Sequence, residues 1–155
     1  MADMKETSMA ETPSRRRFLR MTAAAGLVAG CGTPATGSEP EPFGTVTAGN
    51  VSELTVGTLQ MVPGAPAYIG RDAHGLYAMT STCTHEGCDM ISQGSVDAAG
   101  VYCACHGSRF DANGAVLQGP ATVALAHFKV SVDANGSITV EGGSQVSASV
   151  RLAVA

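Results

Sequence analysis

Length, composition and charge limit the classes of protein to which this chain can belong. Its 155 residues are 45% hydrophobic but only 5% aromatic, without Trp, which suits one modest domain and excludes a large multidomain enzyme. Charged residues make up 14%, with 19 Gly and 7 Pro, which favours a turn-rich β protein and excludes a coiled coil. Because residues 31–155 carry ten Asp/Glu against four Lys/Arg, we expect no nucleic-acid partner.

The first thirty residues have the organisation of an export signal. Residues 14–20 read SRRRFLR and precede a small apolar run at residues 21–30, which is the order of a charged region and an apolar region in a signal peptide. The string resembles the twin-arginine signal of bacteria, which marks proteins that are exported already folded. A run of this length is too short to span a bilayer, so we expect residues 1–30 to act as a signal.

A possible membrane anchor follows directly. Residues 27–31 read LVAGC and resemble a lipobox, in which the chain is cut before the Cys and that thiol is acylated, so Cys31 is the expected lipid attachment point. An ordinary cleavage site, with Cys31 only a small residue beside it, is the alternative. Residues 32–42 contain three Pro and no apolar period, which is typical of a linker. We therefore expect a lipidated Cys and a flexible linker over residues 31–42, anchored on the periplasmic or extracytoplasmic face.

Residues 43–155 are expected to form the folded domain. The pattern Asp-Ala-x-Gly, which suits tight hairpin turns, recurs at residues 72–75, 97–100, 111–114 and 133–136. The expected flanking strand pairs are 67–71 with 76–80, 94–96 with 101–103, and 128–132 with 137–141. These hairpins predict an all-β fold, an antiparallel β sandwich or small barrel without a long helix. With so few aromatic residues the core is thin, so we expect a cross-link or a metal to help stabilise it.

Four Cys and two His lie in two short windows separated by one predicted hairpin. Residues 83–88 read CTHEGC and residues 103–110 read CACHGSRF. Such clustering indicates a metal site or disulfides. A structural zinc site is possible, with the ligands Cys83, His85, Cys103 and His106. Two plain disulfides in an exported chain are a further alternative, although they leave both His unexplained.

The two windows resemble the cluster-binding loops of the Rieske iron–sulfur proteins, specifically the disulfide-containing class. The resemblance is close from Cys83 to about Ala121 and only general in the flanking strands. It implies one [2Fe-2S] cluster per chain, with Cys on one iron and His on the other, at one tip of the fold. The implied ligands are Cys83 and Cys103 for one iron, and His85 and His106 for the other.

The same resemblance implies roles for several neighbouring residues. Cys88 and Cys105 would form a disulfide that joins the two loops. Ser108 stands where the family places a hydroxyl that hydrogen-bonds a bridging sulfur and thereby favours the reduced cluster. Residues 119–121 resemble the start of the proline loop that covers the cluster. Phe110 occupies the position where quinol-oxidising members usually carry a Tyr, and because Phe cannot donate a hydrogen bond, we expect a lower potential.

These features favour one-electron transfer by an exported, membrane-tethered carrier. It would pass electrons between quinol-linked or soluble donors and a cytochrome or an oxidase. The alternative is an iron–sulfur subunit of a quinol:cytochrome c oxidoreductase (a cytochrome bc complex) or of an arsenite-oxidase-like complex, against which Phe110 and the lack of an uncleaved transmembrane helix weigh. A ferredoxin of an oxygenase fits poorly, since those cytosolic proteins lack the disulfide pair and the export signal.

The remaining charged and His residues receive simpler interpretations. The acidic character of residues 31–155 indicates solubility or, as a weaker hypothesis, a basic redox partner. Glu86 and Arg109 flank the cluster loops and could steer a partner, but solvated loop charge is the default interpretation. His74 and His127 lie outside the motifs, and both are expected to be ordinary surface or rim residues.

Overall fold

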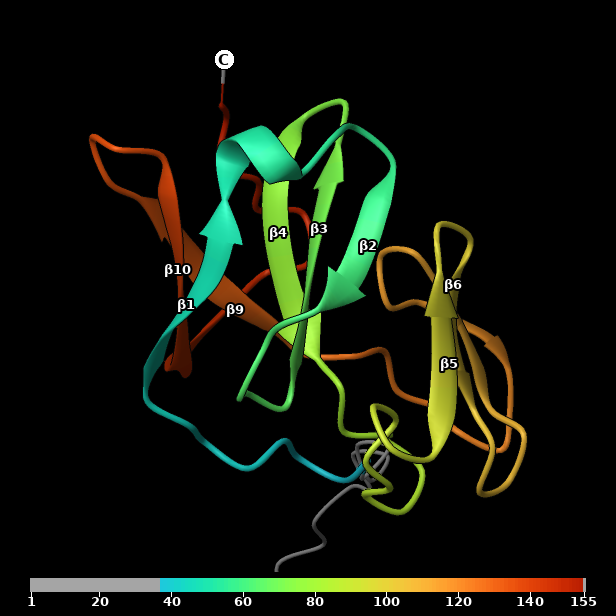
Figure 1. Cartoon of the computed structure of the whole chain (residues 1–155). Helices are drawn as coiled ribbons and strands as arrows, with labels where there is room; N and C mark the ends of the chain where they lie inside the picture. Colours follow the sequence, from blue (N-terminus) through green and yellow to red (C-terminus); the bar gives the residue numbers. More distant parts are fainter. Residues whose placement is uncertain (1–36, 155) are drawn as a thin grey trace, which may run out of the picture. The chain divides into compact units, whose positions relative to one another are not determined.

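The computed structural model describes residues 37–154 (Figure 1). The predicted export signal, Cys31 and the first part of the predicted linker lie outside the described residues. Within residues 37–154, no helix has the length and apolar character needed to cross a membrane. The described end of the predicted linker contacts the domain, because the N–H of Ser38 donates to the carbonyl of Thr84 at 3.0 Å.

The described part of the chain contains two antiparallel sheets and one short 3-10 helix, η1 (Val51–Glu53). The larger sheet has the order β1 (Thr45–Asn50), β10 (Ser137–Val146), β9 (His127–Val132), β4 (Gly75–Thr80), β3 (Ala67–Asp72) and β2 (Thr58–Met61). The smaller sheet has the order β5 (Gly94–Asp97), β6 (Gly100–Cys103), β7 (Arg109–Asp111) and β8 (Val116–Gln118). The predicted all-β antiparallel fold is confirmed.

The repeated Asp-Ala-x-Gly pattern forms the hairpin turns. In all four turns the Asp carboxylate accepts two backbone N–H groups, as Asp97 does from Ala99 and Gly100. Gly100 has a φ of +147°, and a Cβ there would lie 2.0 Å from the carbonyl oxygen of Phe110. Only glycine therefore permits this approach of β6 to β7. The three predicted hairpins are present, and β1, β2, β7 and β8 are strands that the sequence analysis did not propose.

Two neighbouring strands of the larger sheet, β3 and β4, are buried on both faces over most or all of their length. On β3, Ile69 packs in a first core, whereas Tyr68 packs in a second one. On β4, Ala78 lies in the first core and Met79 in the second. This alternation follows from the two-residue period of a strand, and it leaves few polar positions on β3 and β4. The second core also contains residues of β6 and β7, so it packs the smaller sheet against the larger one.

His127 does not lie on the rim of the domain, as the sequence analysis expected. It is only 2% exposed at the start of β9, and its Nε2 atom lies 3.0 Å from the carbonyl oxygen of Asn113. Its ring stacks on Tyr77 with the centroids 5.9 Å apart. Burial lowers the pKa of His127. The position is buried because β9 pairs with the fully buried β4, which could not be foreseen from local sequence.

Candidate metal centre

The two Cys/His windows form loops with the same backbone hydrogen bonds. The first loop, residues 83–88, follows β4, and the second loop, residues 103–108, joins β6 to β7. In each, the first residue donates its N–H to the carbonyl of the sixth, and the fifth donates to the carbonyl of the first, at 2.9–3.0 Å. Gly87 and Gly107 occupy the fifth position with φ values of +73° and +87°. Glycine is favoured at both positions because side chains rarely adopt this conformation.

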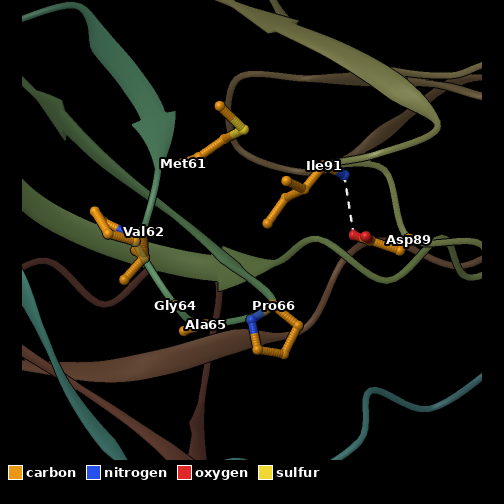
Figure 2. A pocket seen from close by; sticks show the side chains of 8 residues that line it. Met61, Val62, Gly64, Ala65, Pro66, Asp89 and Ile91 are labelled. Carbon is orange, nitrogen blue, oxygen red and sulfur yellow. Dashed lines mark hydrogen bonds between the residues drawn. The ribbon is translucent and has the colours of Figure 1, made fainter.

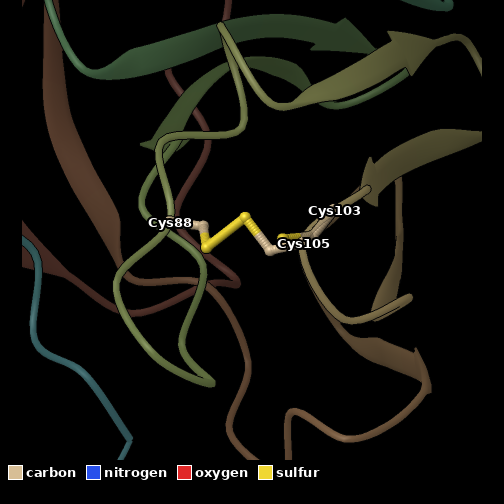
Figure 3. Close-up of side chains that lie close together, drawn as sticks. All are labelled: Cys88, Cys103 and Cys105. Carbon is tan, nitrogen blue, oxygen red and sulfur yellow. A yellow bond between two sulfur atoms is a disulfide. The ribbon is translucent and has the colours of Figure 1, made fainter.

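A disulfide joins the two loops. Cys88 of the first loop is bonded to Cys105 of the second, with the Cα atoms 6.7 Å apart (Figure 3). The sulfurs of Cys88, Cys105 and Cys103 all lie within 4.8 Å of one another, so the disulfide packs beside a free thiol. The expected pairing of Cys88 with Cys105 is confirmed, and the alternative of two plain disulfides is wrong.

The imidazoles of the two loops face each other. His85 and His106 have their Nδ1 atoms 3.3 Å apart, with the rings at 77° to each other. Two nitrogens on one tetrahedral metal, each about 2.0–2.1 Å from it, are separated by roughly this distance. The arrangement therefore suits two nitrogen ligands of a single metal ion. The side chains of His85 and His106 are 26% and 46% exposed, so this end of the site meets solvent.

The free thiols lie on the buried side of the site. Cys83 is 2% exposed and Cys103 is 1% exposed, and both belong to the second core. Burial raises the pKa of Cys103, an effect that the adjacent Cys83 thiol reinforces. The backbone N–H groups of Cys105 and His106 hydrogen-bond the Cys103 sulfur and act in the opposite direction. Such donors, together with a bound cation, stabilise a buried thiolate.

Comparison with known families decides which metal centre this is. Residues 44–129 match the family model of the Rieske [2Fe-2S] domain. The chain belongs to the Rieske family. The Rieske domain binds one [2Fe-2S] cluster, so the zinc alternative is set aside.

Curated relatives of this Rieske chain include iron–sulfur subunits of the cytochrome b6-f complex. The subunit from Synechococcus sp. (strain WH7803) is 41% identical over 78 residues, which cover 48% of this chain and 43% of the relative. The subunit from Prochlorococcus marinus (strain MIT 9211) is 37% identical over 116 residues, covering 69% of this chain and 64% of the relative. The chain thus spans less than two thirds of the length of these relatives.

A solved structure with a similar fold is the cyanobacterial plasma membrane Rieske protein PetC3 from Synechocystis PCC 6803. It is 28% identical, covers 62% of this chain and 98% of its own, and aligns with a TM-score of 0.49. A complex of reduced oxygenase and oxidized ferredoxin in carbazole 1,9a-dioxygenase aligns with a TM-score of 0.48 at 29% identity, covering 66% of this chain and 95% of the other.

The buried hydroxyl of Ser108 has a hydrogen left to donate. Its side chain is fully buried, and its Oγ accepts the N–H of Ala121 at 3.0 Å. A hydroxyl that accepts one bond still has its own hydrogen to donate. No described residue accepts that hydrogen, which fits the sulfur acceptor expected for Ser108. The hydrogen bond from Ala121 to Ser108 also connects residues 119–121, the expected proline loop, to the second loop. The peptide bond between Gly119 and Pro120 is cis.

Sequence reasoning missed the side chains that support the loops from outside. The Thr84 hydroxyl donates to the carbonyl of Val123, and the Gln118 side-chain amide donates to the carbonyl of Gly107 at 3.1 Å. Thr84 is 5% exposed although it lies in a loop. Both are neutral polar residues with no distinctive spacing. Only the position of the partner segment reveals what they do.

An apolar pocket of about 500 Å³ lies near the first loop (Figure 2). Its lining includes Met61, Val62, Pro66 and Ile91. Asp89 is the charged residue of the lining, and its carboxylate accepts a hydrogen bond from the N–H of Ile91 at 3.0 Å. The lining contains neither His nor Cys, so this pocket is separate from the Cys and His side chains of the two loops.

Proposed function

We propose that this chain transfers single electrons through one [2Fe-2S] cluster held by Cys83, Cys103, His85 and His106. The observation that carries the proposal is the pairing of two imidazole Nδ1 atoms at 3.3 Å in the same two loops that hold two buried free thiols, in a domain of the Rieske family. When bound, the cluster accepts one electron from a donor, which reduces one Fe(III) to Fe(II), and releases it to an acceptor.

The two ends of the site have different roles in this proposal. The thiols of Cys83 and Cys103 would bind iron on the buried side of the site, where the second core shields them from water. His85 and His106 would bind iron on the other side, where their side chains are partly exposed and a partner can approach. Ser108 would donate its hydroxyl hydrogen to the cluster and so stabilise the more negative, reduced state.

We propose that the chain works as a tethered carrier in an extracytoplasmic electron-transfer chain. Residues 1–30 export it, and Cys31 holds it on the membrane through the linker at residues 31–42, with residues 43–155 as the electron-carrying domain. The second candidate is a subunit of a quinol-linked cytochrome complex, which the relatives named as cytochrome b6-f subunits favour. Phe110 favours the carrier, because Phe cannot donate the hydrogen bond associated with quinol-oxidising members.

Metal analysis and EPR test the ligand set. We expect two iron per chain and a rhombic EPR signal on reduction, lost in Cys83→Ser and His106→Ala. His74→Ala is the matched control, because His74 is exposed in the β3–β4 turn and lies outside the site. A wild-type chain that contains zinc and no EPR signal would overturn the proposal, as would a normal cluster in both ligand variants.

Cell fractionation tests the tether, and purification tests the partners. We expect the full-length chain in the membrane fraction and Cys31→Ser among the soluble exported proteins. A Cys31→Ser chain that stays in the membrane fraction would contradict lipid anchoring. Co-purification with a cytochrome b in mild detergent would favour the subunit over the carrier, and isolation of the chain alone would favour the carrier.

A further inference from the structure

We propose that the exposed imidazole edges and Glu86 form a docking surface for a redox protein that presents a Lys or Arg. The inference rests on the proposed function, since it concerns the route by which an electron leaves or enters through His85 and His106.

Glu86 is the charged group nearest to both imidazole edges in the described loops. Its Oε2 lies 3.6 Å from Nε2 of His106, and its Oε1 lies 3.9 Å from Nε2 of His85. Both separations exceed hydrogen-bond distance, so the carboxylate lies close to both imidazole rings but is hydrogen-bonded to neither. The Glu86 side chain is 62% exposed. Any protein surface that covers the imidazole edges must therefore also cover this carboxylate.

No cation of the described residues neutralises Glu86. Lys129 pairs with Glu141 at 2.8 Å, and Arg151 pairs with Asp72. Arg71 donates to a backbone carbonyl, and the Arg109 guanidinium lies 4.7 Å from the centre of the Tyr102 ring. These four are all the Lys and Arg of residues 37–154, against ten Asp and Glu. The charge at the imidazole edges is therefore left for a partner to compensate.

The cost of burying a carboxylate decides which partner fits. Covering Glu86 with an apolar or anionic surface removes its hydration without replacing it, a strongly unfavourable change. A Lys or Arg placed against Glu86 supplies the missing partner, and the acidic domain attracts a basic surface from a distance. In the docked pair the one-electron acceptor of the partner would take one electron from the reduced cluster, and no bond would be made or broken.

Small oxidants of opposite charge test the proposal directly. The reduced full-length holoprotein is mixed in a stopped-flow instrument with the tris(phenanthroline) cobalt(III) cation or with the ferricyanide anion, at low and high ionic strength. For Glu86→Gln we expect, at low ionic strength, a rate about three- to tenfold lower with the cation and higher by a similar factor with the anion. High salt should reduce both differences. A change in the midpoint potential of the cluster would shift the rates with both oxidants in the same direction. Rate changes of opposite sign with the cation and the anion therefore identify a local charge effect.

Glu53→Gln is the matched control. It removes the same charge from η1, at the other end of the domain from the first loop (Figure 1), and a glutamine oxygen can still accept the N–H of Asn50. We expect its rates to stay within twofold of wild type. Equal effects of Glu86→Gln and Glu53→Gln, or rate changes of the same sign with both oxidants, would overturn the docking proposal.

A protein probe distinguishes the partner classes. We expect lysine-rich cytochrome c to oxidise the wild-type holoprotein faster than succinylated cytochrome c does. The difference between the two cytochrome rates should be smaller for Glu86→Gln. If Glu86→Gln instead speeds reduction by a water-soluble quinol and leaves cytochrome rates unchanged, an apolar quinone site is the partner and the proposal is wrong. A wild-type chain without the EPR signal overturns the proposed function, and this proposal with it. A normal signal with charge-independent rates overturns the docking proposal alone.

Discussion

Arg151 forms an ion pair with Asp72, 79 positions earlier in the chain, and joins three parts of the domain. Its guanidinium also donates to the side chain of Asn113 and lies 4.2 Å from the centre of the Tyr77 ring. Asp72 belongs to the β3–β4 turn and Asn113 to the β7–β8 turn. Through the side chain of Arg151, the C-terminal segment therefore connects the smaller sheet to the larger one.

Replacement of Arg151 should destabilise the domain clearly. Because the Arg151 side chain is only 13% exposed, we expect Arg151→Ala to lower the free energy of unfolding by about 1–3 kcal/mol, between the values for surface and buried pairs. Urea unfolding of the full chain measures this. Lys129→Ala, which removes an exposed ion pair with Glu141, should cost less than about 1 kcal/mol. Equal losses in the two variants would contradict the role assigned to Arg151.

The same ion pair should make stability depend on acidic pH. Burial acts to raise the pKa of Asp72, but hydrogen bonds from Arg151 and from the backbone of His74 and Gly75, with the Arg151 charge, lower it overall. The stabilisation is complete above the pKa of an unfolded Asp, about 3.9, and is lost as pH falls through the lower folded pKa. The gap in unfolding free energy between wild type and Asp72→Asn should therefore shrink below about pH 4. A constant gap down to pH 2, roughly the lower limit for a paired Asp, would disprove this.

His127 should contribute a second pH dependence, nearer neutrality. Burial lowers its pKa, the Arg151 charge acts in the same direction, and the bond to Asn113 and the charge of Asp111 oppose it. Its Nδ1 atom is buried without a hydrogen-bond partner, so a proton there finds no acceptor. As pH falls below the unfolded value of about 6.5, the unfolded chain takes up the proton first and stability decreases.

The measurement is urea unfolding between about pH 7.5 and 5, a range that spans the unfolded His pKa. His127→Gln should lose less stability over this range than wild type, whereas His74→Gln, at an exposed turn position, should follow wild type. Parallel pH profiles for all three proteins would show that His127 is not responsible.

Ser108→Ala should change both the potential and the stability. Loss of a hydrogen bond to a cluster sulfur should lower the midpoint potential by about 20–65 mV, the equivalent of one hydrogen bond. The substitution also leaves the buried N–H of Ala121 without its partner, which costs about 1–3 kcal/mol. Protein-film voltammetry and urea unfolding measure the two effects, with the exposed Ser95→Ala as control. A lower stability with an unchanged midpoint would mean that Ser108 acts only through Ala121.

Phe110→Tyr should raise the midpoint potential. Phe110 is 1% exposed and belongs to the second core together with the two buried thiols, so a hydroxyl added to its ring would be buried in the protein. A hydrogen bond from it to a ligand sulfur should raise the midpoint by about 20–65 mV. Phe43→Tyr adds the same hydroxyl to a partly buried ring packed against the first core and should leave the potential unchanged. An unchanged or lower midpoint for Phe110→Tyr refutes the expectation.

The sequence was most informative where chemistry restricts the choice of residue. Each Asp-Ala-x-Gly pattern predicted its turn correctly, and three of the four also came with the correct flanking strands, because the Asp carboxylate organises the turn within four or five residues. The pairing of Cys88 with Cys105 was likewise predicted correctly, through resemblance to the disulfide-containing Rieske class. The four proposed ligands remain predictions, although the two imidazoles face each other and the two free thiols are buried in the same two loops.

Long-range pairing set the limit of the sequence analysis. β1 pairs with the distant strand β10, so no local signal marked it as a strand, whereas β2 forms a hairpin with the next strand, β3, through a loop that lacks the Asp-Ala-x-Gly pattern. His127 was misplaced because its burial depends on β4, nearly fifty residues earlier in the chain. Glu86 is exposed, as the default interpretation expected, but its position near both imidazoles could not be predicted because it depends on how the two loops meet.

The disulfide has a consequence for the lifetime of the metal centre. The first loop follows a strand of the larger sheet, and the second loop joins two strands of the smaller one. The bond between Cys88 and Cys105 therefore links the two sheets covalently as well as the two loops. Without it, each loop would sample a wider range of positions, and the four ligands would meet less often. A strongly reducing environment should therefore accelerate iron release from this protein, while an oxidising compartment preserves it.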